Sequence, residues 1–272
     1  MHEKRKIWLA VGAAVLGTTT AANAHNNSND LDGHQQHNMT IIAPFAGAGE
    51  GEGEGEGEGS GMVDLRVNDS AYLARLGLIR GHLYVGKKLY DQGHLAMAKT
   101  HMKHPEDELY AALVPAFSAR GVEGFGDHLN ALADAVNQEQ GDDAVNAAYD
   151  ALIIAIKDAE QVQRKEVKDV LMSLSTMLLT AGEEYDIGVK SGEVVNVHEF
   201  QDAYGFTTIA RSRLDELTEV QREANAEAIA EVEAILASLP PLWPTITPEG
   251  KVAGDSSALY GAAARIELAT LN

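Results

Sequence analysis

Apolar residues from Asp69 onward recur at steps of three and four, which is the period of an α-helix. The positions that carry this first stripe are Leu76, Ile79, Leu83, Gly86 and Tyr90. Gly93 ends the stripe, and a second helix is predicted from near His94 to His104. We expect that helix to stop at His104 because Pro105 disfavours helical backbone in the residue before it. The two segments together predict a helical hairpin that turns at Gly93.

The remaining sequence repeats the helical period. Pro105 suits the first position of a third helix. A loop is expected from Asp186 to Val195, after which Asn196 and Glu199 have the spacing of a capping box. The other predicted helical segments are Val122 to Asn137, two consecutive stripes over Val145 to Ile156 and Val167 to Tyr185, one long helix from Asn196 to Leu239, and Ser256 to Leu271.

No stretch alternates apolar and polar residues as a half-buried strand would. The pattern therefore predicts an all-α fold, an antiparallel helical bundle with two long helices and an N-terminal helical hairpin. Residues 89–98 also resemble the turn of a tetratricopeptide unit, so the same hairpin could bind another protein as a helical repeat does.

The start of the chain has the features of a secretory signal peptide over residues 1–24: basic residues, a short apolar stretch, and small residues that end at Ala24. Residues 25–61 hold no basic residue and contain a Gly-Glu repeat, which predicts a disordered tether. Residues 62–272 are then the helical domain. We expect a periplasmic or secreted protein, with no membrane insertion, because no later segment is long and uncharged enough to cross a bilayer.

Charge and cysteine content narrow the chemistry. The chain has 21 Lys and Arg against 41 Asp and Glu, a formal net charge of -20. Such a surface repels phosphate backbones and attracts cations, so no nucleic-acid partner is expected. The absence of cysteine excludes disulfides and thiolate metal sites. No nucleophile elbow, phosphate loop or zinc-protease helix is present, and we expect no enzyme activity.

Three histidines of the hairpin form the first candidate metal site. His101 and His104 are three residues apart and share a helix face. His82 and this pair both lie about ten residues from the turn at Gly93, so the equal helical rise sets them opposite each other. Glu108, just beyond Pro105, is the predicted fourth ligand. Imidazole is the strongest transition-metal ligand left in a chain without cysteine.

The identity of the metal depends on the ligand that joins the imidazoles. A carboxylate favours iron or zinc, whereas a thioether from Met97 or Met102 favours copper. A structural interpretation also stays open. In it, His82 is a hydrogen-bonded core residue and His104 caps the next helix.

A second candidate site spans the predicted loop. Glu184 and Tyr185 precede the loop, and His198, Glu199 and Asp202 follow it. Carboxylates and a tyrosine suit ferric iron. The alternative is structural, because capping explains Glu199, and the helix dipole explains Asp202.

Two family resemblances connect these residues to iron. The segment from Glu184 to Gly192, followed by Asn196, Glu199, Gln201 and Asp202, resembles the helical periplasmic portion associated with the high-affinity iron permease family. The export signal and helical bundle are also similar to imelysin-like iron-uptake proteins. The permease motif Arg-Glu-x-x-Glu is absent, since Arg222-Glu223 is followed by Glu227, and the imelysin His-x-x-Glu is absent too. The resemblance implies a binding or accessory role in iron uptake without transport activity.

These observations lead to two hypotheses about function. The first is an exported periplasmic metal-binding or metal-delivery protein for iron, with copper or zinc as alternatives. The second is a non-enzymatic envelope module that binds another protein in a helical-repeat-like groove. The partner is accordingly a metal cation in the first hypothesis and an envelope protein in the second. Metal should stabilise the protein only if the first hypothesis is correct.

Overall fold

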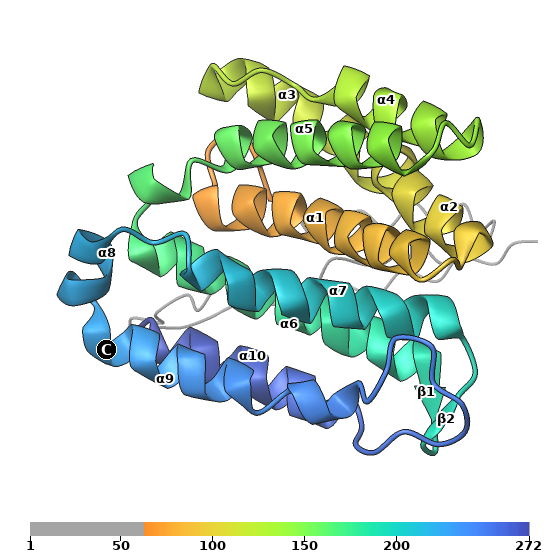
Figure 1. The fold of residues 1–272 in the computed structure, drawn as a ribbon. Coiled ribbons are helices and arrows are strands. Elements are labelled where there is room, and N and C mark those ends of the chain that lie inside the picture. Colours follow the sequence, from red (N-terminus) through yellow and green to blue (C-terminus); the bar gives the residue numbers. More distant parts are fainter. Residues whose placement is uncertain (1–62, 272) are drawn as a thin grey trace, which may run out of the picture. The chain divides into compact units, whose positions relative to one another are not determined.

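The computed structural model describes residues 63–271, apart from the side chains of Asp107 and Glu108. The predicted signal peptide over 1–24 and tether over 25–61 lie outside these residues. Within them the chain is mostly helical, which confirms the all-α prediction (Figure 1). The helices of the N-terminal half are α1 Asp69–Asp91, α2 Leu95–His104, a π-helix Pro105–Tyr110, α3 Ala111–Arg120, α4 Gly126–Asn137 and α5 Asp142–Glu160.

The C-terminal half contains the longer bundle helices and a small hairpin. The elements of this half are a 3₁₀ turn Val162–Arg164, α6 Val167–Gly188, strands β1 Val189–Lys190 and β2 Glu193–Val194, α7 Val197–Leu214, α8 Glu219–Ala224, α9 Ala226–Ala237, a 3₁₀ turn Pro240–Leu242 and α10 Ser257–Ala269. The expected loop over 186–195 is wrong in part: α6 continues to Gly188, and a two-residue antiparallel ladder follows in which Val189 pairs with Val194. No described helix has the length and apolar character that crossing a membrane requires.

The predicted N-terminal hairpin is confirmed. The side chain of Asn68 accepts a hydrogen bond from the backbone N–H of Ala71 and caps the start of α1. Gly93 adopts a φ of 81°, a left-handed conformation that glycine reaches without strain, and α2 follows directly. The hairpin thus turns at the residue that the sequence pattern indicated.

Two predicted helix ends are wrong. His104 stays helical, with φ -49° and ψ -44°, and the chain runs on into the π-helix. The wider π turn accommodates Pro105, which lacks an N–H and would crowd an α-helical carbonyl. The predicted helix over 196–239 is divided into α7, α8 and α9. Thr218 and Gln221 form a capping box that starts α8, so the local cap overrides the apolar period.

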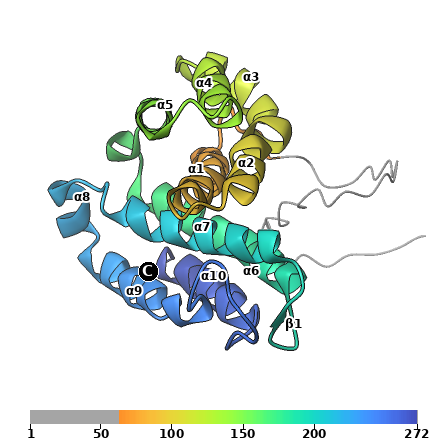
Figure 2. The same ribbon diagram turned by 45° about the vertical axis from the view of Figure 1, so that its right-hand side comes forward.

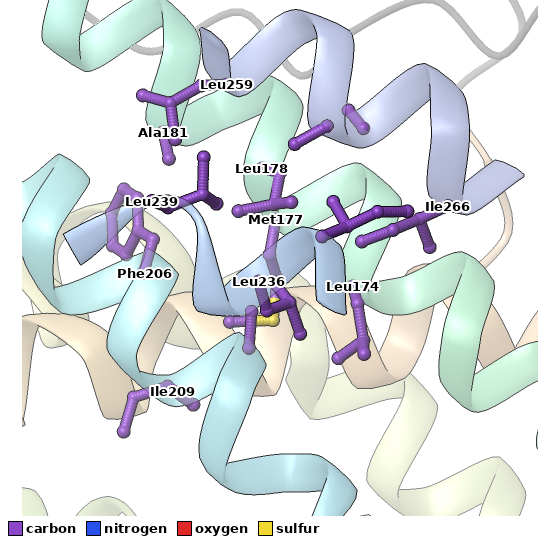
Figure 3. Close-up of a cluster of buried hydrophobic side chains, with 14 of the residues drawn as sticks. Leu174, Met177, Leu178, Ala181, Phe206, Ile209, Leu236, Leu239, Leu259 and Ile266 are labelled. Atoms are coloured by element: carbon purple, nitrogen blue, oxygen red, sulfur yellow. The ribbon is translucent and has the colours of Figure 1, made fainter. Parts of the chain in front are cut away.

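Helix α1 lies between two apolar cores (Figure 2). On one side it packs with α3, α4 and α5, where Leu76, Ile79 and Leu83 are fully buried. On the other side it contacts α6 and α7, whose apolar side chains meet those of α9 and α10. Figure 3 shows this second core, including Leu174, Met177, Leu178 and Ala181 of α6, Phe206 and Ile209 of α7, Leu236 and Leu239, and Leu259 and Ile266 of α10.

Glycines set the spacing of the helices around α1. A Cβ on Gly81 would lie 3.0 Å from the backbone nitrogen of Phe206, so α1 and α7 cross with their backbones in contact. A Cβ on Gly86 would lie 2.7 Å from Cγ of Met102, so α2 also lies close to α1. Helix α7 runs antiparallel to α1, since Gly77 lies opposite Arg213 and Gly81 opposite Gly205. Side chains of α1, α2 and α7 therefore meet between three closely packed helices.

Candidate metal centre

One cluster unites histidines from three helices around a single carboxylate. Its members are His82 of α1, His101 and His104 of α2, and His198 and Asp202 of α7. The hairpin places His82 opposite His101 and His104, as the sequence predicted, with ring centroids 6.4 and 5.6 Å from that of His82. Members of the two candidate sites predicted separately from the sequence, namely the three hairpin histidines and the pair of His198 and Asp202, therefore lie in one cluster.

Asp202 lies at the centre of the cluster. Its Oδ1 atom is 2.6 Å from Nδ1 of His82 and 2.9 Å from Nδ1 of His101. Its Oδ2 atom is 3.2 Å from Nδ1 of His198, which precedes it by one helical turn. His104 completes the cluster, with its ring centroid 4.5 Å from that of His198. A single carboxylate thus faces imidazole nitrogens from all three helices.

Burial gives the cluster an inner and an outer side. His101 is fully buried, and Asp202 and His82 are only 1% and 5% exposed. His104 and His198 are partly exposed. An ionised carboxylate in such surroundings needs cationic or hydrogen-bonding partners to offset its lost hydration. The imidazoles supply these contacts from the inside, and solvent reaches the cluster beside His104 and His198.

The pKa shifts favour neutral His101 and His104 beside an ionised Asp202. Burial lowers the pKa of His101, and burial together with the neighbouring His82 and His198 lowers the pKa of His104 to about 4. Burial alone would raise the pKa of Asp202, but the neighbouring His82, His101 and His198 hold it well below its usual range. Metal coordination requires these same protonation states.

Gln201 fixes the orientation of the most buried imidazole. Its Oε1 atom lies 2.8 Å from Nε2 of His101, and its Nε2 donates to the carbonyl oxygen of Ile246 at 3.1 Å. The amide oxygen of Gln201 must therefore accept a hydrogen bond from His101, and Nε2 of His101 must carry the donated proton. In the neutral ring Nδ1 then bears a lone pair, which faces Asp202. Hydrogen-bonded partners of this kind orient histidine ligands in metal sites.

The methionines considered as copper ligands have other contacts. The sulfur of Met97 lies 3.6 Å from Nε2 of Gln201, on the far side of the amide from His101 Nε2. Met102 packs on Gly86 and belongs to the N-terminal core. The donors gathered around Asp202 are therefore imidazole nitrogens, and the set is one of nitrogen and oxygen ligands.

The other predicted ligands lie at different distances from the cluster. Burial and the neighbouring Glu199 raise the pKa of Glu184 to about 9, and the charge of Asp202 adds to this shift. Glu184 and Glu199 therefore form an acid pair within electrostatic reach of Asp202. Tyr185 is in the C-terminal core, where its ring contacts Phe200 and Trp243, and the structure does not bring it into the cluster. The side chain of Glu108 is outside the described residues.

Sequence reasoning missed the union of the two sites and the role of Gln201. A four-residue spacing puts His198 and Asp202 on one face of a helix, and this could have signalled a pair of ligands. The close approach of α1 and α7 through Gly81 and Gly205 left no comparable signal. Gly81 and Gly205 can be recognised as a contact between helices only when the positions of both helices are known.

Comparison with known proteins gives one match. Residues 159–270 match the family model of the iron permease-associated 4-helix bundle domain. The matched residues make up less than half of the chain. No curated protein and no solved structure matches the chain. The matched region contains α6 to α10 and thus His198 and Asp202, whereas His82, His101 and His104 come from the preceding helices. The chain therefore contains an iron permease-related helical region whose buried Asp202 meets three histidines from outside that region.

Proposed function

We propose that this protein binds a transition-metal ion in the cluster around Asp202 and serves iron uptake as an exported metal-binding or metal-delivery protein. The observation that carries the proposal is the pair formed by His101 and Asp202. With the proton of neutral His101 on Nε2, the lone pair of Nδ1 and the carboxylate oxygen lie 2.9 Å apart. A shared cation, either a proton on Nδ1 or a metal ion, turns the contact between these two atoms into an attraction, and the metal titration described below distinguishes the two.

The spacing of the donor atoms suits a metal ion as that shared cation. Metal bonds to imidazole nitrogen and carboxylate oxygen are about 2.0–2.2 Å long, which separates neighbouring ligand atoms by about 3 Å. The contacts of Asp202 with His82, His101 and His198 range from 2.6 to 3.2 Å. Small adjustments of these side chains would place a metal between them. His82 supports this interpretation, since Nδ1 lacks a hydrogen bond of normal geometry within the described region.

Iron is the proposed cargo, with zinc and copper as the competitors to be tested. Imidazole and carboxylate ligands suit both iron and zinc, and the methionine sulfurs that would favour copper have other contacts. The match of residues 159–270 to an iron permease-associated domain supports iron. The partly exposed His104 and His198 give the ion a side from which to bind and leave, as delivery requires.

A metal titration of the mature protein tests this proposal. Anaerobic ferrous iron, zinc and cupric ions are added separately to the chelator-treated protein, and affinity and melting temperature are measured. We expect binding tighter than micromolar and a higher melting temperature, because the ion binds only the folded state. His104→Ala should weaken binding at least tenfold, whereas His128→Ala, an exposed position on α4, should not change it.

Two results would overturn the proposal. One is the failure of all three ions to bind more tightly than micromolar. The other is an equal response from the His104→Ala and His128→Ala variants. His104 is only partly buried, so its replacement should leave the bundle folded, which far-ultraviolet circular dichroism checks.

A further inference from the structure

We propose that the cluster holds two metal ions bridged by the carboxylate of Asp202, an inference that rests on the proposed metal-binding function. The five ligands divide into two groups that share this carboxylate. The first group is His82, His104 and Asp202, and the second is His101, His198 and Asp202. Within each group the ligand atoms lie within 4.8 Å of one another.

The two oxygens of Asp202 face different members of the cluster. Oδ1 is the oxygen near both His82 and His101, and Oδ2 is the oxygen near His198. A carboxylate in this orientation can bind one ion through each oxygen. Ions bridged in this way are about 3.5–4 Å apart in two-metal sites. Each ion would then have two imidazoles and one oxygen from the protein.

A single ion does not fit all four imidazoles in their observed positions. An imidazole centroid lies about 3.2 Å from a metal bound at about 2.1 Å, so two rings on one ion have centroids at most about 6.4 Å apart. The centroid of His101 is 6.4 Å from that of His82 and 6.5 Å from that of His104. Both rings would therefore have to lie directly opposite His101.

The separation of those two rings excludes this arrangement. The centroids of His82 and His104 are 5.6 Å apart, so they cannot both occupy the position opposite His101. The same 5.6 Å suits two neighbouring ligands of one ion. His101 and His198 stack with nearly parallel rings 3.9 Å apart, so one of these two rings must rotate for both to direct a lone pair at the same ion. The ligand atoms group His82 with His104 and His101 with His198, each pair with Asp202, and His104 also lies beside His198, with ring centroids 4.5 Å apart.

The charge near the cluster is compatible with two cations. Asp202 is the only carboxylate in either group of ligands among the described residues. The pair of Glu184 and Glu199 is within electrostatic reach of it and adds one negative charge beside the site, because burial and Glu199 raise the pKa of Glu184 to about 9. They are not assigned as ligands. Two divalent ions bound by four neutral imidazoles would otherwise gather excess positive charge in a largely buried place.

The number of bound ions tests the inference. The mature chain, with His25, His34 and His37 replaced by alanine so that tail histidines bind nothing, is loaded with cobalt(II) or zinc, desalted and analysed for metal per chain. We expect two ions per chain and, for cobalt(II), magnetic coupling between them in the electron paramagnetic resonance spectrum. His82→Ala and His198→Ala should each lower the ratio from two ions to one and abolish the coupling.

Each other outcome has a defined meaning. One ion per chain in the unsubstituted cluster would overturn the two-ion site while leaving the proposed metal-binding function intact. No bound ion would overturn both. Two ions without coupling would overturn the bridge through Asp202. Because the single-histidine variants retain one complete group of ligands, their residual ion also shows that they are folded.

Discussion

Gly205 of α7 lies against the backbone of Gly81 of α1: a Cβ on Gly205 would fall 2.5 Å from the carbonyl oxygen of Gly81. This contact is next to His82 in α1 and one helical turn from Asp202 in α7. The distance between the two helices, and hence the distance from His82 to Asp202, depends on the absence of side chains at these two positions.

Replacement of Gly205 with alanine should therefore affect both stability and the site. The added methyl group must push α1 and α7 apart, and overpacking of this kind costs about 1–3 kcal/mol. We expect a lower free energy of unfolding in urea and metal binding weakened at least tenfold. Gly261→Ala is the matched control, since Gly261 is exposed on α10 and its Cβ would meet nothing within 4 Å. That control should be neutral or stabilising, and an equal effect of both changes would contradict the prediction.

The hairpin was predictable because its determinants are local. The three- and four-residue period, the left-handed Gly93 and the equal rise of two helices were enough to place His82 opposite His101 and His104. The breaks in the predicted helix over 196–239 were less visible. The apolar period continues across Thr218, so periodicity alone predicts an unbroken helix. It does not take into account the capping box at Thr218, which starts a new helix.

The union of the two predicted sites depends on packing between helices distant in sequence. From the sequence alone, Asp202 is either an acid near a helix start or part of a separate iron site. Its partners His82 and His101 become visible only when α7 lies across both helices of the hairpin. Tyr185, in contrast, lies on the apolar stripe of α6 and is buried in the C-terminal core. Its position beside Glu184 in the sequence therefore does not make it a ligand.

Gln201 should contribute to metal affinity without touching the metal. Its Oε1 accepts from Nε2 of His101 and so keeps Nδ1 of that ring directed at Asp202. Gln201→Leu removes this acceptor, and we expect affinity to fall about 10–100-fold, the usual effect of losing a partner of a histidine ligand. Calorimetric titration measures the change. Gln163→Leu, at an exposed position, is the control and should leave affinity unchanged.

A buried ion network joins α1, α5 and α7 on the other side of α1. Glu160 is fully buried and contacts Nη1 of Arg80 through Oε2 and Nη2 of Arg213 through Oε1, both at 2.6 Å. Arg80 also pairs with Glu216 at 2.9 Å. Glu160 thus neutralises two guanidinium groups that have almost no access to water.

Glu160→Gln should be strongly destabilising. The amide keeps the shape of the side chain but leaves the two arginines without their shared charge, and breaking a buried pair in this way costs about 3–5 kcal/mol. Urea unfolding at pH 7 measures the loss. Glu233→Gln removes the partly exposed pair with Arg222, and it should cost less than about 1 kcal/mol. A loss below that amount for Glu160→Gln would show that the network contributes little.

Glu184 gives the metal-free protein a specific dependence on pH. Burial and the neighbouring Glu199 raise the pKa of its carboxyl group from 4.5 to about 9. The unfolded chain releases this proton near the ordinary value, whereas the folded protein keeps it to higher pH. The unfolded state therefore binds fewer protons between these two values, and stability falls as pH rises across that window.

Glu184→Gln should remove this loss, because a glutamine has no proton to release. In a chelating buffer at pH 8 we expect the variant to be more stable than the unsubstituted protein by on the order of 1–3 kcal/mol. The interval from the ordinary value of 4.5 to pH 8 would give about 5 kcal/mol at about 1.4 kcal/mol per unit, and the proton shared with Glu199 reduces this. At pH 4 the two proteins should have nearly equal stability, since the carboxyl is then protonated in the folded state and mostly protonated in the unfolded state. Urea unfolding at both pH values measures the difference. Glu267→Gln, exposed on α10, is the control and should give the same small effect at either pH. A Glu184→Gln variant that is no more stable at pH 8 than at pH 4, relative to the unsubstituted protein, would show that Glu184 is ionised in the folded protein at neutral pH.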